Sequence, residues 1–184
     1  MGSFFTLRSF KNIFMITIYL SNVNSIDEKS YKKITDNLDL HTLTCPKCSK
    51  HNFVRHGYYM RTLKYRNTSI KLRILRVKCI SCGSTHAILL YFIVPYSQNS
   101  MEIHLKAIQT EYIDDFLEWI QWSEDIAEYS FYFIRWRYRK YWKERIFSEN
   151  ISFDSDLVRR CFDAFSLQFM QIKCTRNIFC IEST

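Results

Sequence analysis

The sequence predicts an α+β fold in which a β module precedes an all-helical region. Two Cys-x-x-Cys units, Cys45–Cys48 and Cys79–Cys82, stand thirty residues apart, a spacing that suits a hairpin of two long strands. Residues 87–94 form an apolar run typical of a buried strand, and from Met101 the apolar residues recur at helical spacing. With 184 residues, 47% hydrophobic and only three Gly and two Pro, the chain has ample material for a core.

The segment before the cysteines is expected to hold one strand and one short helix. Residues 13–20 are apolar and follow two basic residues, but the stretch is too short for a membrane span and no cleavage site follows it. We therefore interpret it as a buried strand of a cytoplasmic protein. Residues 25–34 predict a helix that begins at Ser25 or Asp27.

Between the cysteine pairs the pattern predicts two strands. Residues 53–60 read as the first strand, residues 66–69 as a polar turn, and residues 70–78 alternate apolar and basic side chains. The alternation slips at Ile74-Leu75, which predicts a β-bulge there.

The later part of the chain reads as helices. Ser130 is a good N-cap for a long helix that reaches about Ile146, with a core face at spacings of three and four. A final helix is expected over about 154–172. The predicted core face of the long helix comprises Phe131, Ile134, Tyr138, Tyr141 and Trp142.

The four paired cysteines predict a zinc ribbon. In such a module each Cys-x-x-Cys unit forms a tight turn, and two turns close four thiolates around one structural Zn²⁺ with no open position: the ligands would be Cys45, Cys48, Cys79 and Cys82. Four buried cysteines without metal remain the alternative. A redox site is disfavoured because no thioredoxin-like βαβ pattern surrounds either unit. Three nearby histidines can replace a thiolate, although each is more simply expected to form a hydrogen bond or touch a phosphate: His51, His56 and His86.

The remaining cysteines and the charges indicate the environment and the partner. The chain has seven cysteines, and this odd number together with the metal-type pairing favours a reducing compartment. Residues 40–101 contain ten Lys or Arg and no Asp or Glu; an acidic block follows over 102–130, and a second basic block over 131–145. A net charge of +8 can serve solubility alone, but the acid-free stretch favours contact with nucleic acid.

Several motifs resemble a known family. The runs Cys45–Cys48, Arg55–Arg61 and Arg76–Gly83, with Val94-Pro-Tyr-Ser97, are similar to a zinc-ribbon family of short bacterial proteins of unknown function, itself similar to the N-terminal DNA-binding part of insertion-sequence transposases. The likeness covers roughly residues 40–180, including the segments 135–145, 158–162 and 168–172. One departure is Ser49, where such ribbons often have Gly.

This resemblance implies a zinc ribbon followed by a helix-turn-helix and an origin in mobile DNA. The expected division is an N-terminal strand and short helix over 1–42, a zinc ribbon over 43–98, a helix-turn-helix over 99–148 and a C-terminal helix and tail over 149–184. In that arrangement the helix after Ser130 would enter the major groove of double-stranded DNA.

The function predicted from these features is zinc-dependent DNA binding, as a transposase DNA-binding region or an accessory factor. Helix residues would read bases and strand residues would contact phosphates. Too few residues follow the basic helix for a catalytic core, so no enzymatic activity is expected. The alternatives are a zinc-stapled protein-interaction module, pairing with a second copy or a transposase, and RNA binding. The candidate DNA contacts are Tyr132, Arg135, Trp136, Arg139, Lys140, Lys143, Arg55, Arg61, Lys71, Arg73, Arg76 and Lys78.

Overall fold

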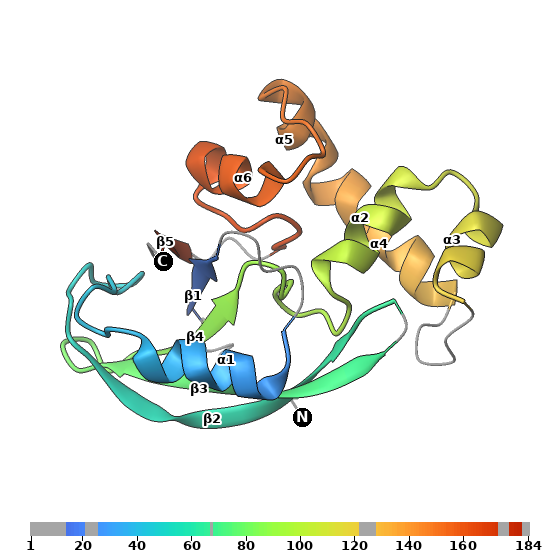
Figure 1. Ribbon diagram of the computed structural model, residues 1–184. Coiled ribbons are helices and arrows are strands. Elements are labelled where there is room, and N and C mark those ends of the chain that lie inside the picture. Colours follow the sequence, from blue (N-terminus) through green and yellow to red (C-terminus); the bar gives the residue numbers. More distant parts are fainter. Residues whose placement is uncertain (1–13, 21–25, 67, 122–127, 173–176, 182–184) are drawn as a thin grey trace, which may run out of the picture.

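A computed structural model describes residues 14–20, 26–66, 68–121, 128–172 and 177–181 (Figure 1). Its centre is one five-stranded sheet with the order β2-β3-β4-β1-β5. Helix α1 contacts β3 and lies over the hairpin strands in Figure 1, whereas α2 to α6 lie in the upper and right part of the view. The elements are β1 (Phe14–Tyr19), α1 (Glu28–Asn37), β2 (Phe53–Lys64), β3 (Ser69–Cys79), β4 (Thr85–Leu90), α2 (Met101–Gln109), α3 (Ile113–Trp119), α4 (Glu128–Tyr141), α5 (Lys143–Ser148), α6 (Leu157–Phe165) and β5 (Asn177–Ile181).

The predicted fold class is wrong in its arrangement. The expected order was a zinc-ribbon β module followed by an all-helical region, but the sheet also includes β1, which precedes the cysteines, and β5, which follows every helix. β1 pairs in parallel with β4 on one side and with β5 on the other. The ribbon strands are therefore part of one mixed sheet and not a separate module.

The burial of β1 explains its central place. Met15, Ile16, Thr17 and Ile18 are all buried, so both faces of this strand are covered. A strand with two covered faces belongs inside a sheet, flanked on both edges. The sequence predicted the strand but not its partners, because parallel partners lie far away along the chain.

The β2–β3 hairpin changes its buried face along its length. Ile74 and Leu75 are adjacent and both fully buried, and neighbouring residues of a strand point to opposite faces. The slip in the sequence pattern therefore marks a switch of the core from one face to the other. The predicted bulge at these residues is wrong; the register of the pair shifts on β2, between Arg55 and Gly57.

Tyr31 of α1 fills the place where β3 and β4 separate. The paired residues of these two strands run from Lys78↔Thr85 to Arg76↔Ala87. At the next position, the Tyr31 hydroxyl takes the place of a direct hydrogen bond between the strands. It accepts from the Leu75 N–H at 3.1 Å and donates to the Ile88 carbonyl at 2.8 Å. Tyr31 is 1% exposed, and burial raises the pKa of its hydroxyl. One side chain thus fixes α1 to both strands.

The helix boundaries differ from the expected ones in detail. Asp27, one of the two predicted caps, begins α1 by accepting from the Ser30 N–H at 2.7 Å. The helix expected to start at Ser130 starts two residues earlier, at Glu128, and is interrupted at Trp142 before α5. The last helix is shorter than predicted because Ser166 adopts a left-handed conformation and ends it.

The helical part joins the sheet through buried polar side chains. Gln168 donates to the carbonyls of Tyr91 and Ile93 at 2.7 and 3.2 Å and accepts from the Thr17 hydroxyl at 2.9 Å. The guanidinium of Arg137, which is 1% exposed, donates to the carbonyls of Pro95 and Met170. These contacts complete buried backbone groups that would otherwise be unpaired. Among the described helices, none combines the length and the apolarity that a membrane span needs.

Candidate metal centre

Two turns of the same construction present the four cysteines. In the first, the Cys45 N–H donates to the Lys50 carbonyl at 2.9 Å and the Ser49 N–H donates to the Cys45 carbonyl at 2.8 Å. In the second, the Cys79 N–H and the Gly83 N–H make the equivalent bonds at 2.9 and 2.8 Å. The second turn directly follows β3, so the hairpin carries it to the first turn.

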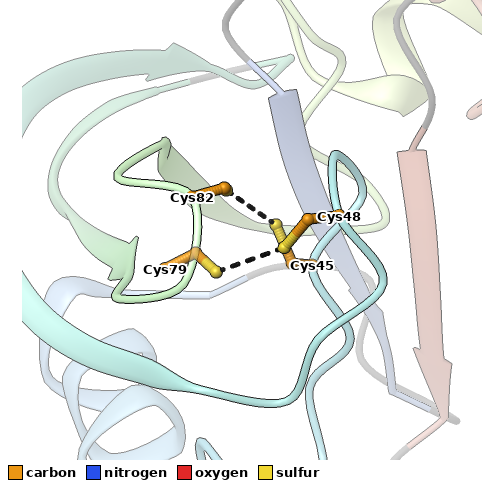
Figure 2. Close-up of side chains that lie close together, drawn as sticks. All are labelled: Cys45, Cys48, Cys79 and Cys82. Atoms are coloured by element: carbon orange, nitrogen blue, oxygen red, sulfur yellow. Dashed lines mark hydrogen bonds between the residues drawn. The ribbon is translucent and has the colours of Figure 1, made fainter.

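The four sulfur atoms converge as a tetrahedral metal site requires (Figure 2). All lie within 4.8 Å of one another, with Sγ of Cys45 and Cys82 3.7 Å apart and Sγ of Cys48 and Cys79 3.6 Å apart. Zinc–sulfur bonds of about 2.3 Å place tetrahedral sulfurs about 3.8 Å apart. The prediction that these cysteines form one cluster is confirmed, and the cluster fits a metal ion.

The two turns have different residues at their left-handed position. Ser49 has φ 59° and Gly83 has φ 70°, at corresponding positions. This conformation suits glycine and costs a residue with a β-carbon free energy. The departure from glycine at Ser49 has thus left the turn geometry intact and placed a modest strain in the first turn.

The sulfurs differ in how readily they lose a proton. Burial of Cys45, which is fully enclosed, raises the pKa of its thiol to about 12. Desolvation also opposes ionisation of Cys82, but hydrogen bonds from the hydroxyl and backbone of Ser84 and from the thiols of Cys48 and Cys45 together outweigh it and lower the pKa of that thiol to about 6. A metal ion favours the thiolate form of every ligand, so metal binding would displace the proton from Cys45.

Of the three nearby histidines, only His86 reaches the cluster. Its side chain is fully buried, and Nε2 lies 3.4 Å from Sγ of Cys45, close enough for an N–H to donate to a thiolate. His51 is exposed and lies beside the Thr44 hydroxyl at 3.4 Å. His56 is exposed at the bulge of β2. A hydrogen bond from a histidine outside the ligand set commonly orients a metal ligand.

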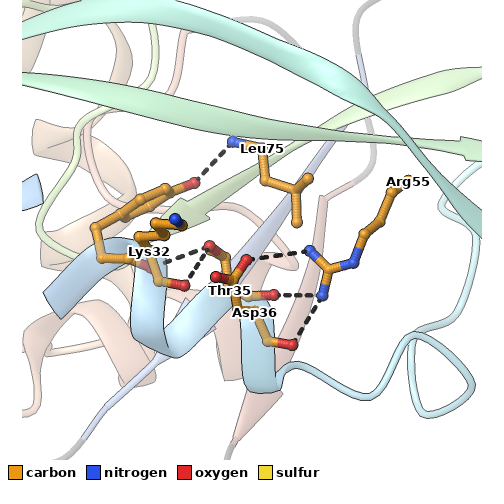
Figure 3. A network of polar contacts seen from close by, with 6 residues as sticks. Lys32, Thr35, Asp36, Arg55 and Leu75 are labelled. Atoms are coloured by element: carbon orange, nitrogen blue, oxygen red, sulfur yellow. Dashed lines mark hydrogen bonds and ion pairs between the residues drawn. The ribbon is translucent and has the colours of Figure 1, made fainter. Parts of the chain in front are cut away.

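Several of the predicted DNA-binding arginines contact the protein itself. Arg55 donates to the carbonyls of Thr35 and Asp36 at 2.7 and 3.0 Å, at the C-terminal end of α1 (Figure 3). Arg135 donates to the carbonyls of Ala107 and Thr110, at the end of α2. Both arginines therefore satisfy carbonyl groups that a helix end leaves unpaired.

Arg66, in the turn of the hairpin, and the predicted contact Arg61 also donate to backbone carbonyls of the protein. Arg66 donates to the Trp119 carbonyl at the end of α3 and lies over the ring of that tryptophan at 5.3 Å. Arg61 donates to the carbonyls of Val94 and Ser97, which follow β4. These contacts hold the hairpin against the helical part of the molecule.

The remaining predicted contacts on the hairpin are exposed. By the alternation of β3, Arg76 and Lys78 lie on one face, next to the second cysteine turn, whereas Lys71 and Arg73 lie on the opposite face. Arg73 stacks over the ring of Tyr58 at 4.6 Å. Within the part of the chain that the structure describes, Arg76 and Lys78 have no ion pair with a carboxylate.

The predicted contacts on the helices lie mostly on the surface of α4. Tyr132 and Trp136 are 57% and 46% exposed, and Arg139, Lys140 and Lys143 are exposed as well. Two further exposed rings were not predicted as contacts: Phe133 stacks on Trp136, and Tyr129 stacks on Phe133. Their spacing of four and then three residues was the available signal.

Comparison with known proteins gives a domain without an assigned function. A family described as a domain of unknown function (DUF6431) matches residues 45–118. This stretch begins at Cys45, the first cysteine of the cluster, and ends within α3. No curated protein matches the chain. No solved structure matches it either.

Proposed function

We propose that this chain is a zinc-stabilised protein that binds double-stranded DNA through Arg76 and Lys78, the outer face of its hairpin. The observation that supports this most is the placement of these two exposed cations immediately before Cys79, in a stretch from 40 to 101 that contains no acidic residue. A polyanion would meet no repulsive carboxylate from that stretch.

Zinc is the metal that the ligand set favours. Four thiolates in a tetrahedron leave no open position for a reacting molecule, so the metal would stabilise the fold and take no part in chemistry. The second turn continues from β3, and the Ile80 N–H donates to the Asn52 carbonyl at 2.9 Å. Metal binding would thereby fix the end of the strand that carries Arg76 and Lys78.

The contacts expected are phosphate contacts. Residues two apart on a strand lie about 7 Å from each other on the same face, so two neighbouring cations can reach two phosphates of one DNA strand. Such contacts provide affinity and register without reading the sequence. Sequence-selective recognition, accessory roles in transposition and a transposase partner go beyond this proposal.

The test compares two double variants of the same strand. Arg76→Ala with Lys78→Ala removes the proposed contacts, and Lys71→Ala with Arg73→Ala is a matched control on the opposite face. Fluorescence anisotropy with a labelled duplex at several salt concentrations is the measurement. The first variant should weaken binding and reduce the magnitude of the salt slope by about two, since each lost phosphate contact removes about 0.9.

Two controls make the result decisive. Both variants should retain one equivalent of zinc and the wild-type circular dichroism spectrum. Equal weakening by the two variants would mean that charge alone, and not this face, attracts DNA. Unchanged duplex binding in the first variant would reject the proposed surface.

A further inference from the structure

Helix α4 carries an exposed row of stacked aromatic rings, which we name the aromatic ladder: Tyr129, Phe133 and Trp136. The first two rings have centroids 5.7 Å apart and planes at 19°, and the second and third are 5.7 Å apart at 26°. The three side chains are 71%, 37% and 46% exposed. They therefore stack on one another in water and not against the core.

The core contacts of α4 are made elsewhere on the helix. Phe131 and Ile134 are buried, and at about 100° per residue they face away from the ladder. Arg137 is buried on the flank of the helix next to Phe133. Phe131 meets Phe116 of α3 at 5.1 Å, so the acidic helix α3 packs on the side opposite the ladder. Among the described residues, the three rings thus stay exposed, and α3 with its carboxylates packs on another side of α4.

Cations border the ladder at its C-terminal end. The ammonium of Lys140 lies 4.9 Å from the centre of the Trp136 ring, and Arg139 is exposed on the neighbouring position. Exposed aromatic rings next to positive charges have the chemistry that recognises bases joined by phosphates.

We propose that the aromatic ladder binds an unpaired nucleic-acid strand, whose bases stack on the exposed rings while Arg139 and Lys140 contact its phosphates. Unpaired bases offer the faces that a duplex keeps stacked on each other, so this surface suits single strands where the hairpin suits duplexes. The rings are already ordered by mutual stacking on a helix, which lowers the conformational entropy lost on binding. The inference concerns a different surface from Arg76 and Lys78 and can hold if that proposal fails.

The charge and the geometry favour this occupant over two others. A lipid surface would take up a broad apolar helix face with its charges on the opposite face, whereas the exposed cations Arg139 and Lys140 adjoin these rings. A second copy would have to bring a complementary acidic face to Arg139 and Lys140. Both alternatives are distinguished by the experiment.

The ladder is tested with two double variants that each remove two exposed rings. Tyr129→Ala with Trp136→Ala opens the ladder, and Tyr112→Ala with Phe147→Ala removes rings that are 65% and 83% exposed and lie outside it. Binding of labelled oligo-dT and oligo-rU is followed by fluorescence anisotropy, with a labelled duplex in parallel. We expect the ladder variant to bind both unpaired strands about tenfold more weakly or worse, since stacking contributes about 1–3 kcal/mol per base. The control variant should bind as the wild type does.

Further readouts separate stacking from charge and from other occupants. Quenching of tryptophan fluorescence by the unpaired strand that is lost in the ladder variant, together with retained duplex binding by that variant, would support the proposal. Binding of unpaired strands that is absent, or equal in both variants, would overturn it. The proposal would also be overturned if the ladder variant bound oligonucleotides as the wild type does but lost association with phosphatidylserine vesicles. The same holds if it bound oligonucleotides normally but lost a dimer that light scattering detects in the wild type.

Discussion

The two ends of the molecule are held together by different chemistry. At one end, two turns bring four sulfurs within 4.8 Å of one another, as a metal ion requires. At the other, helices pack on a sheet through buried side chains, and arginines close the helix ends, as Arg55 does for α1 and Arg135 for α2. A bound metal ion would hold the first end together, whereas the second end is held by contacts within the chain.

The two ends should therefore differ in how strongly their stability responds to a single change. A metal site concentrates its stabilising free energy in a few bonds, so its loss is abrupt and local. A packed region with many hydrogen bonds distributes its free energy, so single changes have smaller effects. Three experiments test the contrast, in order of expected effect.

Removing the metal should have the largest effect. We expect Cys79→Ser with Cys82→Ser to abolish zinc binding and to lower the free energy of unfolding by about 5 kcal/mol or more, because structural zinc contributes strongly to folding. Metal analysis and thermal unfolding with and without a chelator provide the measurement. Cys161→Ala is the matched control, since this buried free thiol lies outside the cluster and its variant should retain zinc. An unchanged melting temperature in the metal-free protein would show that the packed end alone supports the fold.

Acidification should have an intermediate effect that arises at the packed end. His104 is 1% exposed and its Nδ1 contacts the Ser100 carbonyl at 2.9 Å. Burial, aided by the charges of Arg137 and Arg61, lowers the pKa of this histidine to about 3. The neutral form is the folded form, so the histidine's contribution is complete above its unfolded pKa near 6.5 and is lost as the pH falls toward 3.

The expected loss from His104 between pH 7 and pH 5 is about 2 kcal/mol. Urea unfolding at several pH values measures it, with His104→Asn as the comparison because an amide can still donate near the Nδ1 position. A variant whose stability falls with pH as steeply as that of the wild type would assign the effect to other groups.

Exchanging the left-handed residues of the two turns should have the smallest effect, with opposite signs. Ser49→Gly removes the strain of φ 59° and should stabilise the metal-bound protein by about 0.5–1 kcal/mol, whereas Gly83→Ser should destabilise it by a similar amount. Space is not the limit at Gly83, because a β-carbon there would meet nothing within 4 Å. Chemical unfolding in the presence of zinc measures both. Effects of the same sign would mean that the turns are not equivalent.

The metal centre could be predicted from the sequence because its signal is local. Two short cysteine motifs define two turns, and the strands between them bring the turns together whatever surrounds them. Most strands and helices were likewise visible as periodic patterns. The placement of β1 and β5 was not, because parallel pairing joins segments from opposite ends of the chain and leaves only an apolar run at each.

The basic residues show a second limit of the sequence. Arg55, Arg61 and Arg135 were predicted to contact DNA, and each donates to backbone carbonyls in the fold. The N–H groups of a guanidinium can donate to two carbonyls as well as to a phosphate. Residue type alone therefore does not distinguish an arginine that contacts the protein's own backbone from one that contacts DNA. The contacts of each side chain do: among the described residues, Arg76, Lys78 and Arg139 are exposed and donate to no backbone carbonyl, and for them the predicted role stands as a proposal.

The position of β1 between β4 and β5 also constrains how the protein is made. On the ribosome β1 emerges early, and the hairpin with its metal turns can form from nearby residues while synthesis continues. The edge of β1 that pairs with Asn177–Ile181 acquires its partner only after the long intervening stretch has left the ribosome. Until then an apolar strand edge is open to other chains, so the nascent protein should aggregate most readily just before β5 emerges.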